Sequence, residues 1–313
     1  MLTKLSKLKN EISKVLIGRE AEMDFLIISL LQGGHVLLES VPGTGKTLLG
    51  KTFAKSINGE FKRIQFTPDV LPSDVSGIQY FNPKTKEFEL RPGPVMTNIL
   101  LADEINRATP RTQSSLLEVM EEKQVTIDGE TLKLPDPFMV IATQNPVETQ
   151  QGTFPLPAAQ LDRFFMKLNI QYPSFEEELN MIRRFRETDP FTNITAVLST
   201  EDISSMRAAV KKIKVNEDIE KYILAIIRQT REHADIELGA SPRAALALIR
   251  ASQGAAFLKE REYVIPDDVQ KCAQAVLAHR LHITIEASLT KTIEGVFSEI
   301  LQSVAVPVEA GAK

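Results

Sequence analysis

The stretch Leu37–Thr47, LLESVPGTGKT, constrains this chain more than any other, because it matches a phosphate-binding loop at all but one position. The usual pattern is G-x-x-x-x-G-K-[ST], and Ser40 stands where the first glycine belongs. Such a loop joins a buried strand to the start of a helix, so it favours an α/β fold for this part of the chain. A plain Pro-Gly turn between a strand and a helix is the alternative interpretation.

The residues of this loop have the properties that phosphate binding needs. Gly43 and Gly45 leave the backbone free to curl toward an anion. Lys46 can reach the β- and γ-phosphates, and Thr47 offers its hydroxyl to Mg²⁺. Ser40 fits at the strand end without strain if its φ is negative, so we expect nucleotide binding to survive. The predicted nucleotide-binding residues of the loop and the first helical turn are Val41, Pro42, Gly43, Thr44, Gly45, Lys46, Thr47 and Leu48.

Short apolar runs alternate with helical patterns in the first half of the chain, which is typical of a doubly wound α/β domain. The runs predicted to form strands of a parallel sheet are His35–Glu39, Phe61–Phe66, Asn98–Ala102, Phe138–Thr143 and Phe164–Ile170. From about residue 200 onward only helix patterns occur, at 201–212, 217–233, 242–258, 267–280 and roughly 288–302. We therefore predict an α/β nucleotide-binding domain over residues 1–172, a linker over 173–200 and an all-helical domain over 201–313.

One segment, Lys123–Leu134, interrupts the α/β pattern. Asp128-Gly129 at its centre is a strong signal for a two-residue hairpin turn. That turn pairs Val125 with Leu132 and gives the two strands one apolar and one polar face. The segment is therefore predicted to form a β-hairpin inserted just before the fourth strand.

Two further motifs follow predicted strands. Asp103 and Glu104 end the run ILLADE, and Asn145 follows the run VIAT. Parallel sheets bind ligands at the carboxyl edge, where Asp103 would hold Mg²⁺ and Glu104 would polarise an attacking water. Asn145 could hydrogen-bond both a γ-phosphate oxygen and that water. An acidic helix cap and a turn asparagine before proline are the alternative interpretations.

Two arginines are weaker candidates. Arg163, in QLDRFF, lies just before the fifth predicted strand. Arg243 falls in the first turn of a helix begun by Ser241-Pro242, where a cation opposes the helix dipole at a cost of roughly 0.3–1 kcal/mol. An anion nearby would offset that cost, although a solvated arginine is the better interpretation of each residue taken singly.

Composition narrows the class of protein. The net charge of −4 argues against a dedicated nucleic-acid binder, which is usually basic. Cys272 is the single cysteine, so no disulfide can form within the chain, and we expect an inert thiol. No apolar run approaches the ~18 residues that a membrane span needs, and the amino terminus lacks a signal-peptide core. A cytoplasmic protein is expected.

Taken together, the motifs resemble the MoxR family of AAA+ ATPases over almost the whole chain. The stretches that carry the resemblance, in the family's order and spacing, are RIQFTPDVLPSDVSG, LLADEINRATPRTQSSLLEVM, QVTIDGE, VIATQNPVETQQGTFPLPAAQLDRF and GASPRAAL. The resemblance implies a P-loop AAA+ fold: a five-stranded parallel sheet domain with an inserted β-hairpin, and a C-terminal all-helical lid domain. It also implies a helix-2 insert at Gly77–Val95, and a sheet in which the strand before Asn145 lies between the loop strand and the Asp103 strand.

The resemblance also assigns roles to single residues and implies an assembly. The implied roles are Walker A for Lys46 and Thr47, Walker B for Asp103 and Glu104, sensor 1 for Asn145, arginine finger for Arg163, sensor 2 for Arg243, and adenine contact for Ile17 and Gly18. The arginine finger would reach the γ-phosphate bound by a neighbouring subunit. ATP and Mg²⁺ would be bound, hydrolysis would require a homo-hexameric ring, and the lid would rotate between the ATP and ADP states.

Three functions are open to such a protein. The first is a chaperone-like ATPase that matures a client protein complex or inserts a cofactor or metal, working with a separate partner that carries a von Willebrand A-type domain. The second is a nucleic-acid motor, but the candidate basic residues Lys84, Lys86, Arg91, Lys123 and Lys133 are interleaved with Glu87, Glu89, Asp128 and Glu130. The third is a nucleotide-gated scaffold with little turnover. We expect the first, without a nucleic-acid partner.

Overall fold

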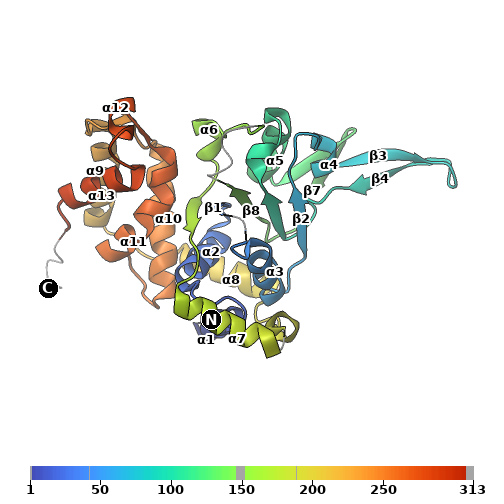
Figure 1. The fold of residues 1–313 in the computed structure, drawn as a ribbon, viewed down its shortest axis with the longest axis horizontal. Coiled ribbons are helices and arrows are strands. Elements are labelled where there is room, and N and C mark those ends of the chain that lie inside the picture. The colour runs from blue at the N-terminus through green and yellow to red at the C-terminus, as the bar shows by residue number, and fades with distance from the viewer. Residues whose placement is uncertain (1, 42, 146–151, 188, 308–313) are drawn as a thin grey trace.

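A five-stranded parallel sheet forms the centre of the α/β part (Figure 1). The computed structural model describes residues 2–41, 43–145, 152–187 and 189–307. The strands run in the order β2-β5-β8-β1-β9, and their bounds are β1 (Val36–Ser40), β2 (Phe61–Gln65), β5 (Ile99–Asp103), β8 (Met139–Gln144) and β9 (Met166–Ile170). The predicted fold class is confirmed, and β8, which leads to Asn145, lies between β1 and β5 as the resemblance implied.

Helices cover both faces of this sheet. The helices of this part of the chain are α1 (Leu2–Ser13), α2 (Glu20–Gln32), α3 (Lys46–Ser56), α4 (Pro72–Ser76), α5 (Pro110–Glu122), α6 (Ala158–Leu161) and the 3-10 turn η1 (Ile105–Arg107). Because successive strand residues point to opposite faces, Val36 and Leu38 enter a large core with α1, α2 and α3, whereas Leu37 enters a second core under α5. The central strands are buried on both faces, which explains their nearly unbroken apolar sequences.

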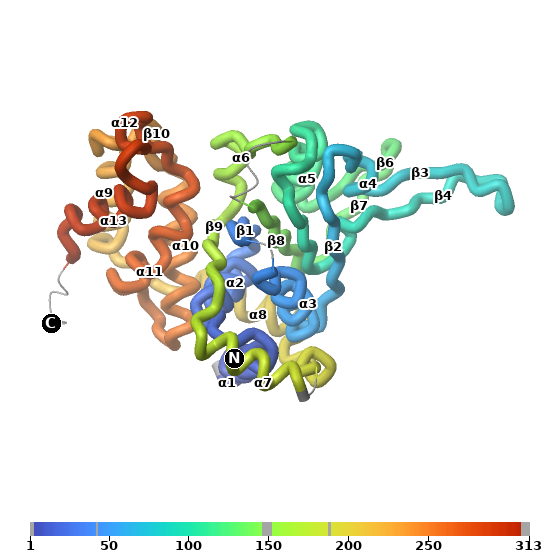
Figure 2. Tube along the Cα trace, viewed as in Figure 1, coloured from blue at the N-terminus to red at the C-terminus, as the bar shows by residue number. Residues whose placement is uncertain are grey.

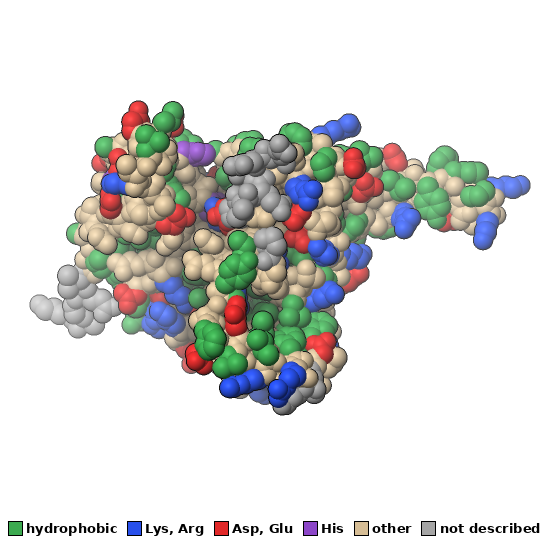
Figure 3. Space-filling view, viewed as in Figure 1, with side chains coloured by type: hydrophobic (Ala, Val, Ile, Leu, Met, Phe, Trp, Pro, Cys, Tyr) green, Lys and Arg blue, Asp and Glu red, His purple; other side chains and the backbone are tan. Residues whose placement is uncertain are grey.

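Two β-hairpins leave the sheet. One consists of β6 (Gln124–Ile127) and β7 (Glu130–Lys133), and it pairs Val125 with Leu132 as predicted. The other, β3 (Gly77–Asn82) and β4 (Glu87–Pro92), lies in the segment assigned to the helix-2 insert and projects from the body as an arm (Figure 2). Figure 3 shows apolar side chains gathered toward the outer end of this arm, next to Lys and Arg side chains, and its exposed apolar residues are Ile78, Tyr80, Phe81 and Phe88.

The rest of the chain is mainly helical, with two departures from expectation. Its elements are α7 (Phe175–Glu187), η2 (Pro190–Asn193), α8 (Thr200–Val210), α9 (Glu217–Glu232), β10 (Ile236–Leu238), α10 (Pro242–Leu258), α11 (Pro266–Leu277), η3 (Ala278–Arg280), β11 (His282–Ile283), α12 (Ile285–Ser288) and α13 (Ile293–Ser303). The expected linker contains a helix, α7, whose acidic first turn and basic last turn complement the helix dipole. Two short strands, β10 and β11, pair where only helices were expected, because segments this short show no periodicity.

The helical part packs directly on the sheet part. Helix α10 lies against α2 so closely that a Cβ atom at Gly254 would come within 2.7 Å of the Ile28 side chain. Residues of α10, α11 and α13 join the large core that also contains α1, α2 and the strands. Among the described residues, no helix combines the length and the apolar composition needed to cross a bilayer. The domain boundaries 1–172, 173–200 and 201–313 stay a prediction.

Candidate active site

A tight loop joins the end of β1 to the start of α3. Gly43 and Gly45 have φ angles of +85° and +80°, in the left-handed region that favours glycine. A Cβ atom at either position would meet no atom within 4 Å, so the backbone conformation and not crowding requires glycine here. Among the described residues no side chain caps α3, which begins at Lys46, so the amides of its first turn are available to an anion.

The predicted loop residues stand together at the carboxyl edge of the sheet. Thr44 Oγ1 donates a hydrogen bond to the Val41 carbonyl oxygen over 3.1 Å, and Thr47 and Leu48 follow Lys46 in the first turn of α3. Pro42 lies outside the described residues. Ser40 ends β1 without a positive φ, so the condition for an unstrained serine is met. Its buried Oγ has no hydrogen-bond partner among the described residues.

The acidic pair lies at the same edge. Asp103, the last residue of β5, is only 5% exposed, and Glu104 follows it with a φ of +56°. Thr143 of β8 joins the two, because its hydroxyl donates to Asp103 Oδ1 over 2.6 Å and accepts the Glu104 N–H over 2.9 Å. Only β8 separates β5 from β1, so a strand spacing of about 4.8 Å puts Asp103 roughly 10 Å from β1. The sheet therefore brings the loop and the acidic pair to one edge, close enough for a single ligand to span both.

Residues of β2 that sequence reasoning missed hold the acidic pair. Arg63 donates to Asp103 Oδ2 through Nη2 over 2.6 Å and through Nε over 3.2 Å. Gln65 Nε2 donates to Glu104 Oε2 over 2.8 Å. The spacing of Arg63 and Gln65 puts both side chains on one face of β2, which the sequence alone indicates. The sequence does not indicate that β2 pairs with β5, so the contacts with Asp103 and Glu104 could not be predicted.

Asn145 is buried just beyond the end of β8. It lines a cavity of about 560 Å³ together with Gln144 and Asn106. Gln144 Nε2 donates to Glu39 Oε1 of β1 over 3.1 Å, which ties the ends of the two strands together. The structure therefore brings Asn145 to the edge where the loop and the acidic pair lie, and its role as sensor 1 stays a prediction.

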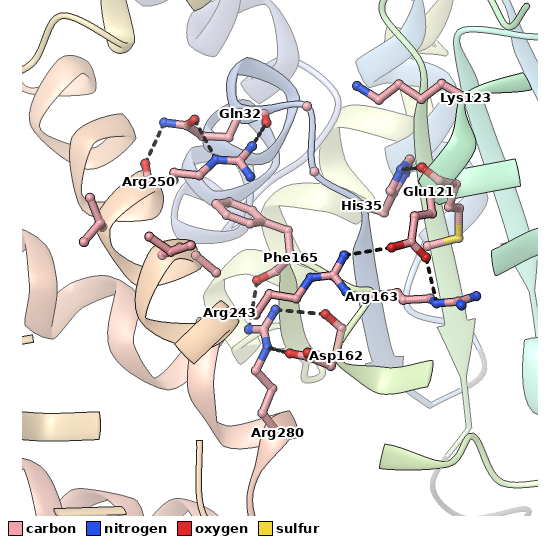
Figure 4. Close-up of a pocket in the computed structure, with 16 residues that line it drawn as sticks. Gln32, His35, Glu121, Lys123, Asp162, Arg163, Phe165, Arg243, Arg250 and Arg280 are labelled. Atoms are coloured by element: carbon pink, nitrogen blue, oxygen red, sulfur yellow. Dashed lines mark hydrogen bonds and ion pairs between the residues drawn. The ribbon is translucent and has the colours of Figure 1, made fainter. Parts of the chain in front are cut away.

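The two predicted arginines meet at one carboxylate. Arg163 Nε lies 3.3 Å from Glu121 Oε2, and Arg243 Nη2 lies 3.2 Å from Glu121 Oε1 (Figure 4). Glu121 belongs to the last turn of α5, Arg163 precedes β9, and Arg243 is in the first turn of α10. All three line a cavity of about 570 Å³. The bland interpretation of each arginine as a solvated cation is therefore replaced by a specific pairing, which sequence reasoning missed because Glu121 has no motif of its own.

This cavity lies at the edge where the strands begin. Its lining includes His35, which precedes β1, and Phe165, which precedes β9. The phosphate-binding loop follows Ser40, so at about 3.3 Å per residue the two edges are roughly 16 Å apart along β1. Arg163 and Arg243 are thus brought to each other, and neither is brought to the loop of its own chain.

The residues predicted to contact adenine lie between α1 and α2. Gly18 has a φ of +68°, and a Cβ atom there would come within 2.0 Å of Glu177 Oε1 on α7. Arg19 Nη2 donates to the Gln171 carbonyl oxygen over 2.6 Å, which fixes this segment to the end of β9. Ile17 is half-buried. The segment therefore adjoins the strand next to β1, and its contact with adenine stays a prediction.

The donor set fits a nucleoside triphosphate with magnesium. Mg²⁺ prefers hard oxygen ligands, and Thr47 and Asp103 supply a hydroxyl and a carboxylate at one edge of the sheet. The uncapped start of α3 and the open space around Gly43 and Gly45 suit a phosphate group. Lys46 adds the positive charge that a polyphosphate requires.

Comparison with known proteins agrees with this geometry. The family model "ATPase family associated with various cellular activities (AAA)" matches residues 35–166, and an AAA lid domain model matches residues 228–300. The chain is 48% identical to the uncharacterized protein YeaC of Bacillus subtilis over 98% of its own length and 96% of the relative's. It is 42% identical to Chaperone MoxR1 of Mycobacterium tuberculosis, over 95% and 81% of the two chains.

A solved structure supports the same assignment. The crystal structure of a candidate ATPase from Cytophaga hutchinsonii is 40% identical to this chain and superposes with a TM-score of 0.91. The match covers 98% of this chain and 96% of the other. Both the lid and the sheet part thus have counterparts in known proteins, and the chain belongs to the MoxR family of AAA+ ATPases.

Proposed function

We propose that this protein hydrolyses ATP at sites shared between neighbouring subunits of a homo-hexameric ring, and that the ring remodels a client protein. The observation that carries the proposal is the separation of the loop and acidic pair from Arg163 and Arg243, which lie at opposite edges of one sheet. A single subunit therefore carries the phosphate-binding half of a site at one edge of its sheet and the arginine half at the other edge. Two subunits placed edge to edge would bring the halves together.

At the carboxyl edge, the chain's own residues bind the phosphates and orient the nucleophile. The amides of the loop and Lys46 would hold the β- and γ-phosphates. Bound Mg²⁺, held through Thr47 and Asp103, would neutralise charge on the same phosphates. Glu104 would accept a hydrogen bond from the attacking water and Asn145 would align it. The hydrogen bond from Gln65 to Glu104 orients that carboxylate before the water arrives.

At the other edge, Arg163 and Arg243 would serve the nucleotide of the next subunit. Charge spreads over the terminal phosphate oxygens as the bond to the leaving group breaks, and guanidinium groups stabilise that charge. An arginine supplied in trans contributes about 10³–10⁵ in rate in other NTPases. Because Arg243 pairs with the same carboxylate as Arg163, the sensor 2 role implied for it would be exercised across the interface together with Arg163.

The arm formed by β3 and β4 supports a protein as the client. Phe81 and Phe88 pack edge to face, with ring centroids 5.5 Å apart, and both are exposed. Exposed aromatic groups on a projecting element favour contact with another protein. One relative carries the printed name chaperone. The client would be a protein complex that needs maturation or cofactor or metal insertion, and a separate von Willebrand A-type protein would act as an adaptor.

The ATPase activity of mixtures of two inactive variants tests this proposal. Lys46→Ala should abolish ATP binding in calorimetry, and Glu104→Gln should bind ATP but turn it over at least about 10²-fold more slowly. Arg163→Ala should also be inactive alone, yet a mixture with Glu104→Gln should regain activity, because each mutant supplies the half that the other lacks. Full activity of Arg163→Ala in a monodisperse monomer would contradict the proposal. Stimulation of the ATPase by DNA would favour a nucleic-acid motor instead.

A further inference from the structure

We propose that Glu121 is a positioning residue, which holds Arg163 and Arg243 as a two-guanidinium receptor for the terminal phosphate bound by the neighbouring subunit. This inference rests on the proposed function, since it names the residue that prepares the trans-acting groups. Glu121 itself would touch neither the nucleotide nor the attacking water.

The carboxylate is shared evenly between two parts of the fold. One oxygen, Oε2, pairs with Arg163 from the segment before β9, and the other, Oε1, pairs with Arg243 from α10. Figure 4 shows the two side chains approaching Glu121 from different elements. The pairing therefore sets the distance between a guanidinium of the sheet part and a guanidinium of the lid.

The pairing leaves most donors of both arginines available. Glu121 contacts Arg163 at Nε, so the two terminal nitrogens of that guanidinium remain open, and it contacts Arg243 at Nη2 alone. Within the described ranges, neither guanidinium has another hydrogen bond or ion pair. A phosphate group binds an arginine through two parallel N–H donors, which Arg163 can still offer. Glu121 thus orients both side chains and leaves the terminal edge of Arg163 open to a phosphate.

The two other arginines of the cavity, Arg250 and Arg280, already have structural partners. Arg280 pairs with Asp162 over 2.6 Å and donates to the Phe164 carbonyl oxygen over 2.7 Å. Arg250 donates to the carbonyl oxygen of Gln32 and lies over the Phe165 ring. The cavity keeps an excess of positive charge, which favours an anionic ligand. Arg163 and Arg243 are the two of these arginines that can respond to it.

Stability alone does not account for the pairing. The side chains of Arg163, Arg243 and Glu121 are 32%, 58% and 39% exposed, and ion pairs this exposed contribute little to folding. Two guanidinium groups held close together repel each other, and the attraction of each to a carboxylate between them offsets that repulsion. The arrangement is therefore better suited to preorganising a binding site, since rigid donors lose less entropy when a phosphate arrives.

Steady-state kinetics of Glu121→Ala tests the inference. We expect kcat per site to fall about 10- to 100-fold, because misplaced catalytic groups reduce the rate by this order, while KM for ATP stays within about 2-fold because the loop is intact. Glu121→Asp should lose less activity than Glu121→Ala. Glu122→Ala is the matched control: it removes the same charge from the next position, which has no ion pair within the described ranges, and should keep its activity. The melting temperatures of Glu121→Ala and Glu122→Ala should both equal that of the wild type.

Mixed rings separate this inference from the proposed function. Glu121→Ala mixed with Glu104→Gln should regain activity, since intact arginines of the second mutant serve intact loops of the first. Activity could return in the mixture of Arg163→Ala with Glu104→Gln but not in the mixture of Glu121→Ala with Glu104→Gln. That result would overturn the role of Glu121 but would still support sites shared between subunits. Recovery in neither mixture would overturn the proposed function itself. A rise in kcat for Glu121→Ala would also overturn the inference, because Glu121 would then compete with the phosphate.

Discussion

Thr143 Oγ1 lies 2.6 Å from Asp103 Oδ1, and the same hydroxyl oxygen accepts the backbone N–H of Glu104. One side chain of β8 thus fixes two consecutive residues at the end of β5. A hydroxyl can do both because it donates one hydrogen bond and accepts others. This relationship makes Thr143 the centre of the carboxyl-edge half of the proposed site.

Replacing Thr143 with valine should weaken magnesium-dependent activity. Thr143→Val keeps the shape but removes the donor to Asp103, and losses of about 10- to 100-fold are usual for residues that orient metal ligands. The Mg²⁺ concentration for half-maximal ATPase should rise. Stability should fall by about 1–3 kcal/mol, because the Glu104 N–H loses its acceptor. Thr97→Val is the control, since Thr97 is buried and donates to a carbonyl away from the site. An equal rise of the half-maximal Mg²⁺ concentration in Thr143→Val and Thr97→Val would contradict the prediction.

Replacing Ser40 with alanine should leave nucleotide binding unchanged. The Ser40 hydroxyl is buried with no hydrogen-bond partner among the described residues, so it supports no loop contact there. We expect the Kd for a non-hydrolysable ATP analogue to stay within about 2-fold, and stability to stay equal or to rise by up to about 1 kcal/mol. Calorimetry and chemical denaturation measure the two quantities. A tenfold weaker Kd would give the hydroxyl a role that its surroundings do not suggest.

Acid should destabilise the protein through His35. Burial lowers the pKa of His35 to about 4, and the neutral ring accepts the Val140 N–H at Nδ1 while Nε2 lies 3.1 Å from the Met120 carbonyl oxygen. The unfolded chain protonates His35 near pH 6.5 and the folded chain does not. The contribution to stability is therefore complete above pH 6.5 and decreases as the pH falls toward 4, by up to about 3 kcal/mol.

Urea denaturation at pH 7 and pH 4.5 measures this effect. Carboxylates also titrate in this range, so the comparison is between the wild type and His35→Gln. The variant should lose less stability between the two pH values. Burial also holds the pKa of His279 well below its usual value, so some pH dependence of the same sign should remain. Equal losses in the wild type and the variant would contradict the assignment to His35.

Cys272 should be unreactive in the native protein. Its side chain is fully buried in α11, and burial raises the pKa of the thiol to about 12. Only the thiolate reacts, so a disulfide reagent at pH 8 should label no thiol in native protein and one thiol per chain in urea. The labelling rate then reports local opening of the lid core. Prompt labelling without denaturant would show that α11 is less well packed than the structure indicates.

Local signals account for much of what the sequence predicted. The hairpin at Asp128-Gly129 was predictable because its turn and its strand pairing lie within a few residues. The apolar runs of the central strands β1, β5 and β8 were predictable because these strands are buried on both faces. The short pair β10–β11 was not, and α7 was missed although the charges at its two ends follow the helix dipole.

Pairings between distant segments accounted for most of what was missed at the site. Nothing near Glu121 indicates that residues before β9 and at the start of α10 converge on it. The support of Asp103 by Arg63 likewise depends on the order of strands in the sheet, which the resemblance left open for β2. Positions next to a motif were thus predictable, whereas the side chains that hold them were not.

The large core shared by the sheet, α10, α11 and α13 limits how a subunit can move. A hinge between lid and sheet would have to pull Gly254 away from Ile28 and wet the apolar surface around them. Because that cost opposes a hinge, we expect each subunit to move as one rigid body. The rotation that the resemblance implies for the lid would then occur at the interfaces between subunits. In such a ring each β3–β4 arm would move with the body of its own subunit, so a rotation at an interface would displace the arm that projects from it.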